Sequence, residues 1–188
     1  IGLNAAGSGY IRHPGGMDTG IGIQGGSSSG PTGTIIGTNS DGAYDGDEGN
    51  LISGNSNSGI WLAGQQGTLI AGNTIGLSAP GAKGSAKVPN GGSGIWINTT
   101  SAIPPASPVW IGTNGDDISD AFERNTISGN DGDGIKIEDG GEHTIAGNFI
   151  GLDFDGSNSN LGNGANGIYL TATAATMTLI GTNGDGVY

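Results

Sequence analysis

Two acidic segments, residues 37–48 and 112–123, repeat one set of oxygen-bearing side chains at one spacing. Counting the first glycine of each segment as position 1, these side chains fall at positions 3, 5, 9 and 12. They are Asn39, Asp41, Asp45 and Glu48 in the first segment and Asn114, Asp116, Asp120 and Glu123 in the second. A hard divalent cation such as calcium prefers carboxylate and amide oxygens. The pattern therefore predicts structural calcium sites. A partial third copy at the end of the chain carries Asn183 and Asp185.

Both segments resemble the calcium loops of EF-hands and dockerins. Gly42 stands at the sixth position, where a sharp turn is needed, and Ala43 could offer its carbonyl at the seventh. The chain departs from that pattern at position 1, which is Gly37 and Gly112 rather than Asp, and at the sixth position of the second loop. That position is Asp117, which would need a positive φ. The alternative interpretation is a pair of acidic turns without a metal.

The elements that would carry these loops recur along the chain. Ile-Ser-Gly-Asn occurs at 52–55 and 127–130, and Ile-Ala-Gly-Asn at 70–73 and 145–148, all with a period of about 75 residues. This period predicts a single domain with internal repeats at 1–74, 75–149 and, in part, 150–188. Within each repeat a short coil of about 23 residues alternates with a long coil of about 52.

Each coil contains three apolar pieces of a few residues, rich in Ile and bounded by Gly, Asn or Ser, which is the pattern of short strands. Such strands gain partners when coils stack and like strands pair in parallel. The fold class predicted is all-β: a right-handed parallel β-helix of about five coils with three parallel sheets. Three inward columns of isoleucine are expected: Ile1, Ile52, Ile75, Ile127, Ile150; Ile21, Ile60, Ile95, Ile135, Ile168; and Ile36, Ile70, Ile111, Ile145, Ile180.

These units resemble the repeats of right-handed parallel β-helix proteins of the pectin-lyase-like kind. The resemblance covers nearly the whole chain and implies the fold, but it implies no one activity, because such folds host lyases, hydrolases, adhesins and non-catalytic arrays. One asparagine per coil should also stack, each amide bonding to the next. The members of this ladder are Asn50, Asn73, Asn125 and Asn148. The alternative is that these asparagines simply tolerate left-handed turns.

Two columns of outward-facing side chains are candidates for binding a ligand or a partner. The first contains Trp61, Trp96 and Tyr169, with Lys136 between the last two, and its rings could stack on sugars or on one another. The second is an apolar stripe that is either covered by the long insertions or serves as an interface. Its members are Ile35, Leu69, Trp110, Thr144 and Leu179.

The charge and composition of the chain favour some classes of binding partner and exclude others. The chain has 17 acidic and 5 basic residues, a net charge of −12, no cysteine and 42 glycines among 188 residues. Such a surface repels phosphate backbones, so we expect no nucleic-acid partner. No apolar run is long enough to span a membrane. Calcium is the expected partner, with a polysaccharide or cell-surface ligand as a further one, and calcium use favours a secreted or cell-surface location.

Catalysis is the less favoured interpretation. The Gly-His-Gly and Arg-x-Lys motifs of pectin hydrolases are missing, and the basic residues do not cluster as a lyase would need. Asp131 and Asp133 are expected to lie solvated in a turn, and His143 aligns with Thr34, Thr68 and Thr178, which suggests a tolerated position rather than a catalytic one. A glycosidase with paired carboxylates remains open.

The sequence therefore favours a non-catalytic, calcium-stabilised extracellular segment with a scaffold or adhesion role. The alternative is a module that binds or modifies carbohydrate, as a lyase, hydrolase or epimerase. The chain begins within a coil and ends within the third acidic loop, so we expect a fragment of a longer array. End-to-end or side-by-side self-association is expected as well.

Overall fold

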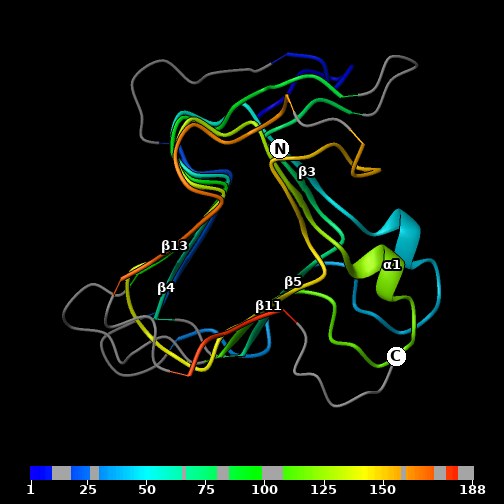
Figure 1. The fold of residues 1–188 in the computed structure, drawn as a ribbon, viewed down its shortest axis with the longest axis vertical. Coiled ribbons are helices and arrows are strands. Elements are labelled where there is room, and N and C mark those ends of the chain that lie inside the picture. The colour runs from blue at the N-terminus through cyan, green and yellow to red at the C-terminus, as the bar shows by residue number, and fades with distance from the viewer. Residues whose placement is uncertain are drawn as a thin grey trace.

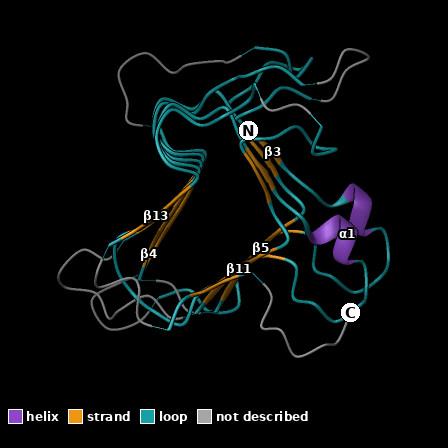
Figure 2. Cartoon of the chain, viewed as in Figure 1, coloured by secondary structure: helices purple, strands orange, loops and turns teal. Residues whose placement is uncertain are grey.

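The computed structural model describes residues 1–9, 18–25, 30–64, 67–79, 85–98, 108–157, 160–171 and 177–181. In this part of the chain the protein is a parallel β-helix, with three sheets of short strands stacked along one axis (Figure 1, Figure 2). The helical elements described here, η1 (Asp45–Asp47) and α1 (Asp120–Glu123), are far too short to cross a membrane.

All strand pairs in the three sheets are parallel, and neighbours in space come from successive coils. The first sheet contains β1 (Ile21–Gln24), β4 (Ile60–Ala63), β7 (Ile95–Ile97), β10 (Ile135–Ile137) and β13 (Ile168–Leu170). The second contains β2 (Ile35–Gly37), β5 (Thr68–Ala71), β8 (Val109–Gly112), β11 (Thr144–Ala146) and β14 (Leu179–Ile180). The third contains β3 (Leu51–Ile52), β6 (Thr74–Ile75), β9 (Thr126–Ile127) and β12 (Phe149–Ile150).

The register confirms the predicted inward columns. Ile60 pairs with Ile95, and Ile95 with Ile135, so like residues lie directly above one another. The other two sheets pair their isoleucines in the same way. The middle members of all three columns are 0–3% exposed. Burial of apolar surface stabilises by about 25 cal/mol per Å², so these columns supply the main favourable term of folding.

The predicted asparagine ladder is present at the turn between the second and third sheets. The Nδ2 of Asn73 donates to Oδ1 of Asn125 at 3.0 Å, and the Nδ2 of Asn125 donates to Oδ1 of Asn148 at 2.9 Å. The amides of Asn73, Asn125 and Asn148 also donate to strand carbonyls of the preceding coil, as that of Asn125 does to Ile70 O at 2.8 Å. The ladder therefore ties this turn to the strands of the coil before it.

A second asparagine ladder lies at another turn, and the sequence analysis missed it. The Nδ2 of Asn55 donates to Oδ1 of Asn90 at 2.7 Å, that of Asn90 to Asn130 at 2.8 Å, and that of Asn130 to Asn163 at 2.9 Å. A signal was available in the sequence, because each of these asparagines stands four residues before a Gly-Ile pair. Two ladders thus hold two of the turns through which the coils stack.

Gly37 and Gly112 mark the points where the acidic loops leave the second sheet. Both have positive φ, 99° and 97°, and a Cβ built on either would lie within 2 Å of a carbonyl oxygen of the next coil. Only glycine fits such a close approach with that backbone conformation. The repeated glycine therefore fixes where each loop begins.

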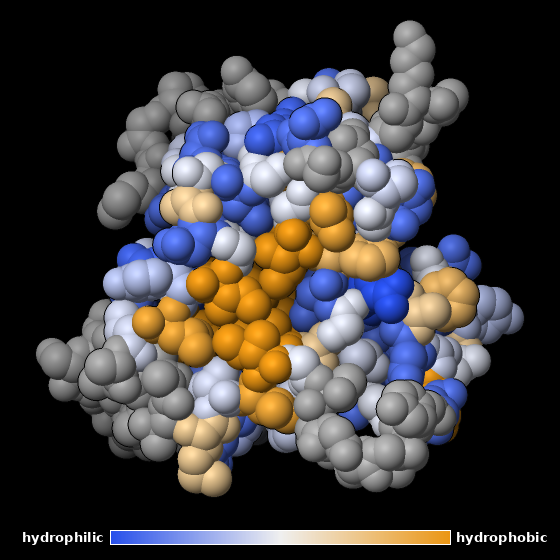
Figure 3. All heavy atoms as spheres, in the orientation of Figure 1, coloured by the Kyte–Doolittle hydropathy of each residue, from blue (hydrophilic) through white to orange (hydrophobic). Residues whose placement is uncertain are grey.

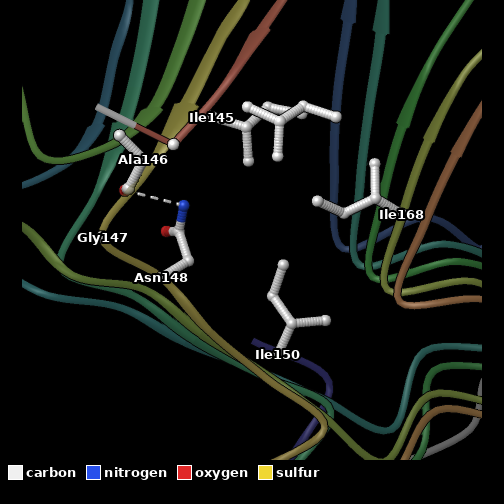
Figure 4. A pocket seen from close by; sticks show the side chains of 8 residues that line it. Ile145, Ala146, Gly147, Asn148, Ile150 and Ile168 are labelled. Atoms are coloured by element: carbon white, nitrogen blue, oxygen red, sulfur yellow. Dashed lines mark hydrogen bonds between the residues drawn. The ribbon is translucent and has the colours of Figure 1, made fainter. Parts of the chain in front are cut away.

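The end of the stack that carries β13 and β14 leaves part of the core uncovered. Figure 3 shows a continuous apolar patch on this end, and Ile180 there is 53% exposed. A shallow hollow in the patch is lined by Ile145, Ile150 and Ile168, with the amide of Asn148 at its side (Figure 4). The expectation that a further coil or a second molecule covers this end stays a prediction.

Candidate functional site

The two acidic loops project from the same edge of the β-helix. The first connects β2 to β3 and contains η1, and the second connects β8 to β9 and contains α1. The short turn at Gly72 lies against the second loop, since its N–H donates to Glu123 O at 2.8 Å. The helical turns η1 and α1 contact one another, and Gly46 lies against the ring of Phe122. The loops therefore form one acidic unit beside the solenoid (Figure 2).

The second loop brings three carboxylates together. Asp116, Asp120 and Glu123 each place an oxygen within 4.8 Å of the others. Among the described residues, no other group of three acidic or histidine side chains converges in this way. At about 5 Å, two like charges repel by roughly 3–4 kcal/mol at an effective dielectric constant near 20. A cation bound among these three carboxylates would offset this repulsion.

Two oxygens of this group lack any hydrogen-bond partner. Glu123 is fully buried at 0% exposure, and its Oε1 accepts no hydrogen bond, while its Oε2 accepts one from the N–H of Asn114 at 2.8 Å. Oδ1 of Asp120 is likewise buried and without a partner. A buried carboxylate oxygen without a donor is costly. Both atoms have the chemistry of metal ligands.

No basic side chain neutralises the group among the described residues. Arg124 is adjacent in sequence, but its Nε donates to Gly147 O at 2.6 Å and its guanidinium lies 4.4 Å from the centre of the Phe149 ring. The described ion pair, between Lys136 and Glu138 at 2.7 Å, lies on the first sheet. The described basic residues thus leave the charge of the second loop uncompensated.

The first loop has the same spacing but different internal contacts. Asp45 accepts from Thr38 Oγ1 at 2.8 Å and from the N–H of Gly42 at 3.0 Å. A third donor, the hydroxyl of Ser119 in the second loop, is the largest cause that lowers the pKa of Asp45; the other two donors add to this effect and burial opposes it. The carboxylate of Asp45 is therefore well satisfied by protein donors.

The structure brings together part of the predicted ligand set. Of the second loop, Asp116, Asp120 and Glu123 converge, whereas the amide of Asn114 bonds to Asp116, donating to its Oδ2 at 3.1 Å. Asn39 and Asp41 are bonded to each other in the same way. Asp117 has the positive φ that the sequence required, at 64°. The remaining predicted ligands, Asn183 and Asp185, lie outside the described residues.

The aromatic column on the first sheet is in the predicted register. The rings of Trp61 and Trp96 are 6.4 Å apart and tilted by 41°. Their indole N–H groups donate to Asn98 and Glu138, at 2.7 and 2.8 Å. Lys136 lies 5.5 Å from the ring of Trp96 and separates it from Tyr169 in the column. This geometry favours packing of the two indole rings against each other. Sugar binding by the aromatic column stays a prediction.

The expectation that Asp133 is solvated is wrong. This residue is 8% exposed, and its Oδ1 accepts from the N–H and the Nδ2 of Asn166, at 2.9 and 2.8 Å. Its carboxylate thus secures the turn of the next coil, which is a structural role. Asp131, by contrast, is exposed.

The apolar stripe on the second sheet is open to solvent at several positions. Ile35 is 50%, Trp110 43% and Leu179 36% exposed. The insertions expected to cover the stripe include residues 80–84 and 99–107, which lie outside the described residues, so this interpretation stays a prediction. Use of the stripe as an interface stays a prediction too.

Comparisons with known proteins do not extend these findings. A scan against protein-family models, a search of curated proteins and a search of solved structures each gave no significant match to the chain. The class of protein is therefore defined by the fold alone, as a parallel β-helix with two inserted acidic loops.

Proposed function

We propose that this chain is a non-catalytic β-helix scaffold whose second acidic loop is held in place by a divalent cation, with calcium as the natural ligand. The observation that supports this most strongly is the convergence of Asp116, Asp120 and Glu123 around two buried oxygens that have no donor. Calcium takes six to eight oxygen ligands, so water would complete the shell. The cation would offset the repulsion among the carboxylates and fix the loop against the coils.

The number of protein ligands indicates weak binding. Position 1 of the loop is Gly112, so one of the usual carboxylates is missing. Modules that work outside cells bind calcium with dissociation constants of about 10⁻⁴–10⁻³ M, because the ion is abundant there. We therefore propose an extracellular or cell-surface setting, where the β-helix would serve as a rigid spacer or an adhesive surface.

Thermal unfolding of the whole chain tests the proposal. Calcium at about twenty times its dissociation constant should raise the melting temperature by roughly 3–7 °C over the value in excess EDTA. Glu123→Gln should abolish this rise. It should also raise the melting temperature in EDTA, because it removes one of three repelling charges.

Asp131→Asn is the matched control, since it removes an exposed acid outside both loops. It should leave the calcium response intact. An equal calcium response in Glu123→Gln and wild type would contradict the proposal, and so would the absence of any response in wild type.

A further inference from the structure

The two acidic loops share part of their backbone conformation. Three equivalent pairs have positive φ: Ser40 with Gly115 at 64° and 73°, Gly42 with Asp117 at 82° and 64°, and Tyr44 with Ser119 at 64° and 59°. The final glutamate closes each loop in the same way, Glu48 onto the N–H of Asn39 and Glu123 onto that of Asn114. The loops differ in the turn before this glutamate, which is a 3-10 turn in η1 and an α-helical turn in α1, and in their side-chain contacts.

The side chains at the ninth position differ in their donors. In the first loop Asp45 receives the hydroxyl of Thr38 and the N–H of Gly42. In the second loop Oδ1 of Asp120 is buried and has no donor. The first loop thus supplies its aspartate with protein donors, whereas the second leaves its aspartate for a ligand.

We infer that only the second loop binds a cation, and that the first loop is closed instead by the protein groups that donate to Asp45. The inference rests on the proposed cation site. It differs from the symmetric expectation of the sequence, in which both loops bind calcium. Asp45 does not belong to the converging group of carboxylates.

Calorimetric titration of the whole chain with calcium chloride tests the stoichiometry. The expected value is one ion per chain in wild type and in Glu48→Gln, and none in Glu123→Gln. Two ions in wild type, reduced to one by Glu48→Gln, would overturn the inference and leave the proposed function standing. No binding in wild type would overturn both.

Discussion

At the residue scale, aspartate side chains have different roles at different positions of the chain. Asp133 is buried and fixed by Asn166, Asp45 is buried and satisfied by three donors, and Asp120 keeps a buried oxygen without one. Aspartates in similar sequence surroundings thus have either a structural role or the properties of a metal ligand. Local donors decide the difference, because a carboxylate with enough of them has no need of a cation.

His143 gives a prediction at this scale. It is fully buried, its Nδ1 accepts the N–H of Val109 at 3.2 Å, and burial lowers its pKa more than the backbone of Asp139 raises it. The unfolded chain therefore takes up a proton near pH 6.5 that the folded chain refuses. Stability should be complete above this pH and should fall as the pH drops below it.

His143→Thr provides the comparison, because Thr68 occupies the same column fully buried. Urea unfolding between pH 7.5 and 5.5 should show a clear loss of stability in wild type and a smaller loss in the variant. Equal slopes with pH in the two proteins would refute a role for this histidine.

At the element scale, the turns hold the coils together as much as the strands do. The strands are two to four residues long, too short to be stable as isolated pairs. Stacking identical coils lets each strand pair on both sides and lets each turn asparagine bond to the next. The isoleucine columns and the asparagine ladders thus both arise because the same residues recur in successive coils.

Replacement of an inner ladder residue should be costly. Asn125→Ala would remove the side-chain partner of Ile70 O and of the backbone N–H of Asn73 in a buried turn, so we expect a loss of about 2–4 kcal/mol in unfolding free energy. Asn50→Ala removes a terminal member that bonds to one neighbour and should cost about 1 kcal/mol. Chemical denaturation measures both, and similar costs would argue against the ladder as the stabilising feature.

Much of this architecture could be predicted from the sequence because it repeats residue by residue. The isoleucine columns and the first ladder follow from identical motifs one period apart. The second ladder was harder to find, because Asn90 and Asn163 stand outside the Ile-Ser-Gly-Asn motif. The inequality of the loops could not be predicted, since it depends on which groups of the folded loops donate to Asp45 and which leave Asp120 without a donor.

At the scale of the whole molecule, acidic residues far outnumber basic ones. The net charge is −12, and the acids of the two loops gather at one edge of a narrow solenoid. Self-repulsion of this kind destabilises a compact state. One bound cation at the point where the carboxylates converge would reduce that repulsion where it is strongest and would tie the loops to the coils.

The most direct measurement of this claim is a crystal structure of the chain grown with calcium. The account predicts one ion in the second loop, bonded to oxygens of Asp116, Asp120 and Glu123 at about 2.3–2.6 Å, with water in the remaining positions. It predicts none in the first loop, where Asp45 keeps its bonds to Thr38 and Gly42. A second loop without an ion at saturating calcium would contradict the account.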